Sequence, residues 1–159
     1  MKKKIINILP ILLTVIIVII HLYNYITIEK SFMDENNVEI ELPESTTKLF
    51  HMPSDTAGYA YVYEYTPYTI NELEYKSWLN KIDEDEVEYL TTVYKKIYEY
   101  YDENAKKILD EAFDYKSIIN KDNYYAILGI DQPGKFKKLV IVDDVSAKMY
   151  YFSFFLHID

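Results

Sequence analysis

Hydrophobic positions in the middle of the chain first recur at every second residue, a spacing typical of β-strands. The stretch GYAYVYEYTPYT (residues 58–69) places a tyrosine at alternate positions and predicts a strand with all of these rings on one face. VEIEL (residues 38–42) and KLFHM (residues 48–52) precede it and predict two further strands. We therefore expect three strands before the first helix.

The spacing changes to three and four residues after Thr69, as in an amphipathic helix. Thr69 with Glu72, and Asp83 with Glu86, match the capping box that opens many helices. The first helix is predicted to run to about residue 82, and the second to about residue 119 with an interruption near residues 102–104.

The last part of the chain alternates again and predicts three more strands. They are YYAILGI (residues 124–130), KKLVIV (residues 137–142) and KMYYFSFFLHI (residues 148–158), separated by turns. Both alternating sets of the last strand are largely apolar, so both of its faces should be covered. The order βββααβββ predicts an α+β fold, with an antiparallel sheet of about five to six strands and two or three helices packed on one face.

The N-terminus carries a continuous apolar run instead of a periodic one. Three lysines precede IINILPILLTVIIVII (residues 5–20), and the stretch without an acid or a lysine extends to residue 28. These roughly 24 residues are long enough to cross a bilayer at ~1.5 Å per residue, and the lysines before them favour a cytoplasmic N-terminus. The predicted organisation is a cytoplasmic tail (1–4), a single-pass transmembrane signal anchor (5–28), a stalk (29–37) and an extracytoplasmic domain (38–159).

A cleaved signal peptide is the main alternative for this segment, because it has the same charged start and apolar run. Cleavage requires small residues in an A-x-A-like pattern, and no Ala or Gly occurs before Ala57. A cytoplasmic C-terminus and a buried helix are further alternatives. The expected location is the cell membrane, with the C-terminal domain outside.

The amino-acid composition excludes several kinds of functional site. The chain has no cysteine and three glycines, which excludes disulfides, thiolate zinc sites, thiol nucleophiles and glycine-rich phosphate loops. Isoleucine, tyrosine, asparagine and lysine are abundant and arginine is absent, as expected from an AT-rich genome. The 18 tyrosines partly reflect this bias, so their spacing is better evidence than their number.

Charge separates the two ends of the chain. The net charge is −9, and beyond residue 28 there are 14 lysines and 26 acidic residues, a net charge of −12. Such a surface repels nucleic acid and favours cationic partners. We therefore expect no nucleic-acid partner.

No catalytic, metal-binding or cofactor-binding residue is predicted. The acidic run DEDEVE (residues 83–88) lacks the spacing and the glycine of an EF-hand, and acids at a helix N-terminus are favoured without an ion. The three histidines, His21, His51 and His157, lack the spacing of a zinc site.

The tyrosine row is the candidate binding face. Each ring can bury about 150–250 Å², which favours covering it, and the apolar stripe of the second predicted helix could provide the cover. An aromatic row with hydroxyl tips also suits sugar rings or the extended chain of a partner. Core and binding face are both open for the four tyrosines Tyr59, Tyr61, Tyr63 and Tyr65.

These features together predict a non-enzymatic, membrane-anchored binding domain of a bacterial envelope protein. Its anchor would hold it at high effective concentration near membrane-bound or wall-bound partners. One alternative is an inhibitor or immunity protein that meets a cationic toxin or enzyme with its acidic surface. Another is a cell-wall hydrolase that uses carboxylates such as Glu64 or Asp143.

Overall fold

The computed structural model of the chain describes residues 10–20, 22–23, 38–41, 43–52, 58–129 and 137–154. The chain forms two compact units, Met1–Leu42 and Pro43–Asp159. In the first unit, residues 10–20 and 22–23 are helical, and the rest of the predicted membrane segment lies outside the described residues. Within the described part of the chain, no helix has both the length and the apolar character needed to cross a bilayer.

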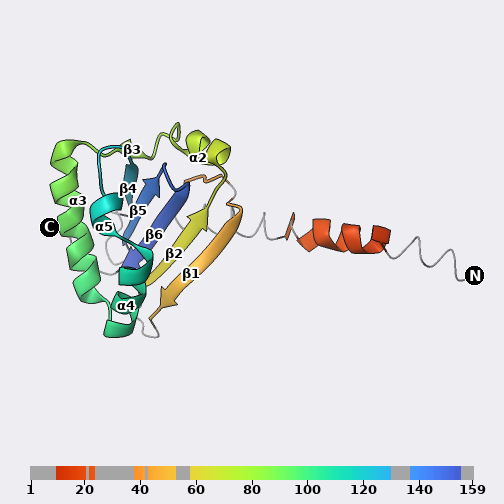
Figure 1. The fold of residues 1–159 in the computed structure, drawn as a ribbon, viewed down its shortest axis with the longest axis horizontal. Helices are drawn as coiled ribbons and strands as arrows, with labels where there is room; N and C mark the ends of the chain where they lie inside the picture. Colours follow the sequence, from red (N-terminus) through yellow and green to blue (C-terminus); the bar gives the residue numbers. More distant parts are fainter. Residues whose placement is uncertain are drawn as a thin grey trace, which may run out of the picture. The chain divides into compact units, whose positions relative to one another are not determined.

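The second unit is built on one six-stranded sheet in which every neighbouring pair is antiparallel. Its order is β1-β2-β6-β5-β4-β3, so the last strand of the chain lies in the middle and β1 and β3 lie at the edges (Figure 1). This confirms an α+β fold with an antiparallel sheet and several helices. The strands are β1 (Ser45–His51), β2 (Tyr59–Glu64), β3 (Asn80–Lys81), β4 (Tyr124–Leu128), β5 (Lys137–Asp143) and β6 (Lys148–Phe154).

The helices are α2 (Pro67–Leu73), α3 (Glu84–Tyr100), α4 (Glu103–Ala112) and α5 (Tyr115–Ile118). The predicted capping box of α3 is confirmed: the Asp83 carboxylate accepts from the Glu86 amide at 2.9 Å, and the Glu86 carboxylate accepts from the Asp83 amide at 3.0 Å. The predicted interruption is also confirmed, because Asp102 caps a new helix by accepting from the Ala105 amide at 2.8 Å.

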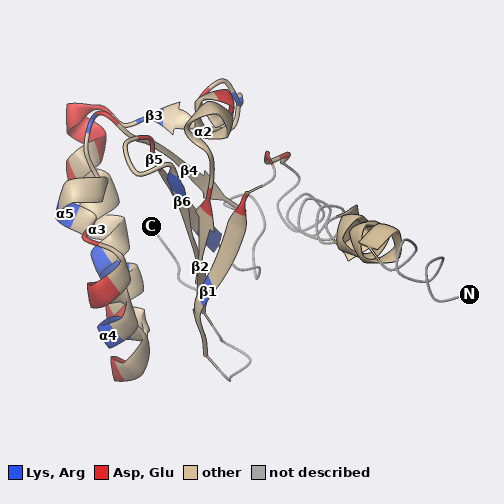
Figure 2. Ribbon diagram, turned by 45° about the vertical axis from the view of Figure 1, so that its right-hand side comes forward, with Lys and Arg blue, Asp and Glu red and all other residues tan. Residues whose placement is uncertain are grey.

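Helices α3, α4 and α5 lie together on one face of the sheet, as Figures 1 and 2 both show. Buried side chains of the two layers form the main core. Phe113 is central to it, with its ring 4.8 Å from that of Tyr150 and 5.0 Å from that of Phe152. The sheet contributes Ala60, Val62, Leu139, Ile141, Tyr150 and Phe152. The helices contribute Leu90, Ile97 and Leu109 among others, and Phe113 follows directly after α4.

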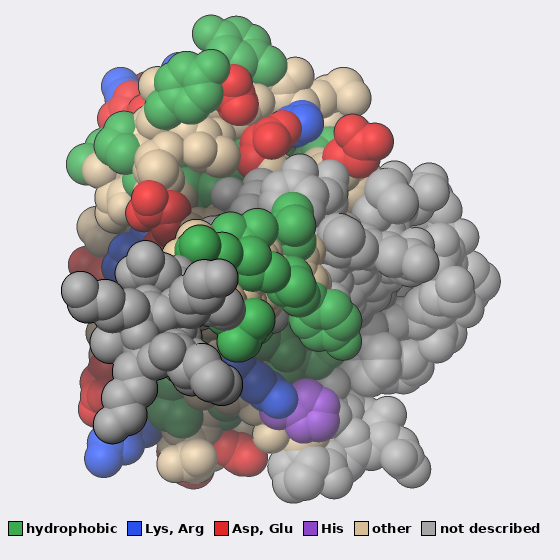
Figure 3. Space-filling view, turned by 90° about the vertical axis from the view of Figure 1, so that its right-hand side faces the viewer, with side chains coloured by type: hydrophobic (Ala, Val, Ile, Leu, Met, Phe, Trp, Pro, Cys, Tyr) green, Lys and Arg blue, Asp and Glu red, His purple; other side chains and the backbone are tan. Residues whose placement is uncertain are grey.

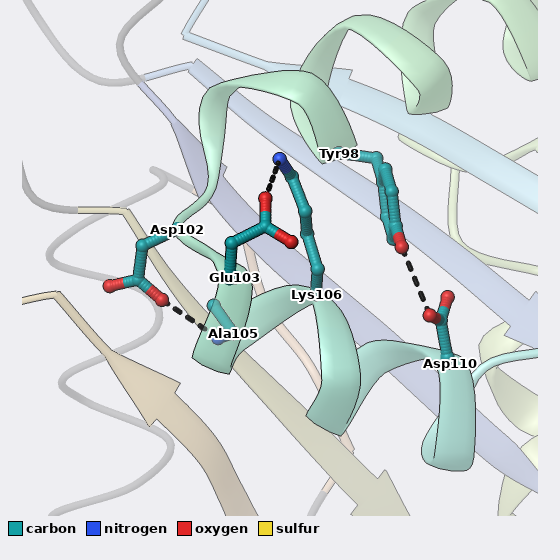
Figure 4. Close-up of polar contacts among 6 residues, drawn as sticks. All are labelled: Tyr98, Asp102, Glu103, Ala105, Lys106 and Asp110. Carbon is teal, nitrogen blue, oxygen red and sulfur yellow. Dashed lines mark hydrogen bonds and ion pairs between the residues drawn. The ribbon is translucent and has the colours of Figure 1, made fainter.

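A polar network on the outside of the helical layer joins α3 to α4 (Figure 4). The Tyr98 hydroxyl donates to the Asp110 carboxylate at 3.0 Å, and Lys106 pairs with Glu103 at 2.8 Å while lying 5.8 Å from the centre of the Tyr98 ring. The bond to Asp110 raises the pKa of Tyr98, and the bond to Glu103 raises the pKa of Lys106. The network is exposed and links neighbouring helices, so we assign it a structural role.

Two sequence-based predictions were wrong, one for the segment before β1 and one for the segment after β2. Residues 38–41 have no regular secondary structure, because alternation produces a strand only where a hydrogen-bonded neighbour exists, and the first ladder begins at Ser45. The first helix begins at Pro67, which suits the first helical position, and its cap is Thr66, whose hydroxyl accepts from the Thr69 amide at 3.0 Å. It ends at Leu73, and β3 follows where the helix was expected to continue.

Predictions for the last three strands were confirmed apart from their ends. β4, β5 and β6 occupy the expected segments, and residues 130–136 and 155–159 lie outside the described residues. All residues of β6 from Met149 to Phe154 are buried, which confirms that both faces of this strand are covered.

Candidate binding surface

The tyrosines of β2 lie on the face of the sheet that is opposite to α3, α4 and α5. Ala60 and Val62 belong to the core cluster under these helices, and strand alternation directs Tyr59, Tyr61 and Tyr63 to the other side. The expectation that the helical stripe covers the tyrosines was therefore wrong. The smaller side chains of β2 face the helices instead.

A bulge in β1 places two ionisable side chains beside these tyrosines. Lys48 pairs with Tyr61 and His51 pairs with Tyr59, and the register shifts at Leu49 between them. In a regular strand, residues three apart would point to opposite faces, so the extra residue brings Lys48 and His51 to the same face. We call the set Lys48, His51, Tyr59, Tyr61, Tyr63 and Tyr151 the tyrosine face.

The rings of the tyrosine face form a continuous aromatic cluster across three strands. His51 stacks on Tyr59 with 6.2 Å between ring centroids, and Tyr59 stacks on Tyr151 of β6 at 6.0 Å. Tyr61 meets Tyr59 edge-on at 5.4 Å, and Tyr63 meets Tyr151 edge-on at 6.4 Å. These contacts hold the tyrosines against one another and define a preformed surface.

Exposure divides the four candidate tyrosines into two pairs. Tyr63 and Tyr65 are buried, with 7% and 5% of their surface exposed, and Tyr151 beside them is 1% exposed. Tyr59 and Tyr61 are only partly buried. In Figure 3 the purple histidine side chain lies next to a blue lysine side chain. Tyr63 and Tyr65 thus serve as core, while Tyr59 and Tyr61 offer ring surface to solvent.

The tyrosine side of the sheet differs in charge from the helical layer. Strand positions on the tyrosine side carry Lys48, His51, Lys81 and Lys138, and no described strand residue on that side is acidic. Helices α3 and α4 together carry eight acidic residues and four lysines, and Figure 2 shows acidic residues along this layer. The helical layer is therefore more acidic than the tyrosine side of the sheet.

The two carboxylates considered for hydrolysis flank one lysine. Glu64 and Asp143 both pair in register with Lys148, whose ammonium lies 3.3 Å from the Glu64 carboxylate. Ser45 donates to Glu64 at 2.7 Å and Ser146 donates to Asp143 at 2.5 Å. The Ser45 bond and Lys148 lower the pKa of Glu64, whereas a general acid needs a raised pKa. This arrangement does not favour hydrolysis.

Metal-ligating residues do not gather in the described part of the chain. No group of three histidines, aspartates or glutamates there is placed to hold an ion. Asp83 and Glu86 of the acidic run are engaged in the capping box of α3, and His51 stacks on Tyr59. The other two histidines lie outside the described residues.

No protein-family model, curated protein or solved structure matches this chain.

Sequence reasoning identified three tyrosines of this surface, Tyr59, Tyr61 and Tyr63, but missed Lys48, His51 and Tyr151 as their neighbours. Pairing of β2 with β6 brings Tyr151 opposite Tyr61, and sequence alternation does not reveal which strands pair. The bulge at Leu49 likewise has no marker in the sequence, because neither glycine nor proline occurs there.

Proposed function

We propose that the protein is a non-enzymatic binding protein of the bacterial cell envelope, held in the membrane by its N-terminal segment. In this proposal the tyrosine face contacts an envelope protein outside the membrane. The observation that carries the proposal is the pair of partly exposed tyrosines, Tyr59 and Tyr61, beside the exposed side chains of Lys48 and His51.

Tyr59 and Tyr61 can each contribute to binding because part of each ring is still in contact with water. Covering the remaining area of one ring would stabilise a complex by on the order of 1 kcal/mol. The neighbouring Lys48 ammonium and His51 imidazole supply polar contacts at the same surface. Because the rings are already held by stacking, little conformational entropy would be lost on binding.

The membrane anchor is proposed from the apolar run of residues 5–28. The described helical part exposes large apolar side chains, among them Leu12, Ile16 and Ile19. The Thr14 hydroxyl donates to the Pro10 carbonyl at 2.9 Å, so the hydroxyl and the carbonyl are hydrogen-bonded without water. A helix that is apolar on all sides suits a lipid environment. We propose a cytoplasmic N-terminus, a stalk over residues 29–37 and an external domain over residues 38–159.

The absence of cysteine from the chain makes this topology directly testable. Single cysteines introduced as Lys3→Cys and Asn104→Cys have no background reactivity, and Asn104 is exposed on α4. In intact cells, a membrane-impermeant maleimide should label the Asn104→Cys variant, and should label Lys3→Cys only after permeabilisation. Labelling of both or of neither in intact cells would contradict the proposed topology.

A photo-crosslinking amino acid placed at single positions tests the binding surface in cells. Incorporation at Tyr61 should yield one discrete crosslinked partner, and incorporation at Tyr75, which is 87% exposed, should not. The matched variants Tyr61→Ser and Tyr75→Ser should both fold, and only Tyr61→Ser should reduce formation of the complex. Equal crosslinking at the two sites, or no effect of Tyr61→Ser, would contradict the proposal.

A second candidate function uses the acidic helical layer instead. The eight acidic residues of α3 and α4 favour a cationic partner, as expected of an inhibitor or immunity protein. A crosslinker at Glu99, which is exposed on α3, distinguishes the two. Capture of a partner through Glu99 and not through Tyr61 would favour this second function.

A further inference from the structure

Strand β1 is the long edge of the sheet. The other edge, β3, has two residues, whereas β1 has seven. Ser45, Thr46, Thr47 and Lys48 are all exposed along it. An edge strand presents backbone N–H and C=O groups that can pair with a further strand.

Charge at this edge indicates what kind of strand would pair with it. Lys48 and His51 are exposed on the tyrosine face, and neither forms an ion pair with a described residue. They stand next to Tyr61 and Tyr59, which are their partners in the ladder. Opposite charges on directly facing strand positions stabilise pairing, so a carboxylate that faces the Lys48 ammonium on an added strand would be favoured. The exposed His51 imidazole can donate a hydrogen bond to a second carboxylate.

A second copy of this chain is a poor occupant of the same edge. Lys48 is the central residue of β1, so two β1 strands paired antiparallel about their centres would place the two Lys48 side chains opposite each other. Like charges in that position are destabilising, and lysine on an edge strand is a known device against self-pairing. The bulge at Leu49 further disturbs pairing between copies.

We propose that β1 accepts an extended acidic segment of a partner protein as a seventh strand of the sheet. Carboxylates of that segment lie opposite Lys48 and His51, at the border of the Tyr59 and Tyr61 rings. The inference rests on the proposed binding function and specifies the chemistry of the partner. It assigns backbone pairing to β1 and the choice of partner to Lys48 and His51.

Synthetic peptides provide a direct test on the full-length protein in detergent micelles. The probe is the labelled peptide acetyl-TETETET-amide, and its lysine counterpart acetyl-TKTKTKT-amide is the charge control. Fluorescence anisotropy should detect binding of the acidic peptide and not of the basic one. Hydrogen exchange measured by mass spectrometry should slow in residues 45–51, because strand addition protects backbone amides.

Charge reversal supplies the matched variants. Lys48→Glu should weaken binding of the acidic peptide by about two- to fivefold, as expected for one exposed ion pair, and should strengthen binding of the basic peptide. Lys95→Glu makes the same change at an exposed position of α3 and should alter neither affinity. Equal effects of the two variants would show that only net charge matters and would overturn the proposal.

Two further outcomes would also overturn it: no binding of the acidic peptide, or binding without slower exchange in β1. If the acidic peptide fails to bind while a crosslinker at Tyr61 still captures a partner in cells, strand addition is wrong and the proposed function stands. If the crosslinker captures nothing either, both are wrong.

Discussion

Replacing Gly58 with alanine tests how closely β2, β6 and α3 are fitted together. A Cβ atom at this position would lie 2.3 Å from Cε1 of Tyr101 and 2.9 Å from the carbonyl oxygen of Ser153. Both distances are shorter than ordinary van der Waals contact. The Tyr101 ring is 2% exposed, packs edge-on against Phe50 at 4.6 Å and donates its hydroxyl to the Ser153 carbonyl at 3.0 Å. Neither neighbour can move away without losing a buried contact.

Three effects set the size of the change in unfolding free energy. Overpacking of a buried site costs about 1–3 kcal/mol, and displacing Tyr101 from its hydrogen bond costs roughly 0.5–1.5 kcal/mol more. Alanine restricts the unfolded chain and returns about 0.4–1 kcal/mol. We therefore expect Gly58→Ala to destabilise the protein by about 0.5–4 kcal/mol.

Urea unfolding of the full-length protein in detergent, followed by the fluorescence of Trp78, measures this loss. Asn104→Ala, an exposed substitution to a better helix former, serves as the control and should change stability by less than about 0.5 kcal/mol. In a Tyr101→Leu background the cost of Gly58→Ala should fall, because the clashing ring is gone. A cost below about 0.5 kcal/mol in the wild type, or the same cost in both backgrounds, would refute this account of the packing.

Three other predictions concern stability. Asp83→Ala removes the capping box of α3 and should lower the unfolding free energy by about 0.5–2 kcal/mol in the same urea assay; no loss would contradict a stabilising cap. Burial and a hydrogen bond to Glu86 raise the pKa of Tyr125 to about 12. The contribution of Tyr125 to the free energy of unfolding is therefore present below about pH 10, the pKa of an unfolded tyrosine, and is lost as the pH rises toward 12. Urea midpoints at pH 9 and 11 should therefore differ less in Tyr125→Phe than in the wild type, and an equal difference would contradict this. The Ser153 hydroxyl is buried without a described hydrogen-bond partner, so Ser153→Ala should be neutral or stabilising, and a loss above about 1 kcal/mol would argue that the hydroxyl is bonded.

Local signals in the sequence predicted those elements whose cause is local. The Asp83 cap and the break at Asp102 depend on side chains that satisfy backbone amides within three residues, so they can be read directly. The strands after residue 120 are bounded by turns and strongly alternating, and they too were placed correctly. The α+β class followed from the order of these elements.

Features that depend on pairing between distant segments could not be predicted in the same way. The central position of β6 brings Tyr151 beside Tyr61, although these residues are 90 positions apart in the chain. The two faces of β2 were also assigned wrongly from the sequence. Burial of the tyrosine rings is favourable, but this energy does not indicate which element covers them. The helices took the face with Ala60 and Val62, and the tyrosines packed against one another on the other side.

The centre of the sheet is buried on both faces, whereas the tyrosine cluster is partly exposed near the edge strand β1. Antiparallel sheets commonly leave one face in water, yet in β5 and β6 Val140, Val142 and Met149 on the tyrosine side are as deeply buried as Leu139 and Phe152 on the helical side. Burial on the tyrosine side decreases toward β4 and β3 at one edge of the sheet, and toward β2 and β1 at the edge where the tyrosine cluster lies. Because the cluster is rigid at its buried end and open at this edge, a partner that binds at β1 would meet a surface already in its bound shape.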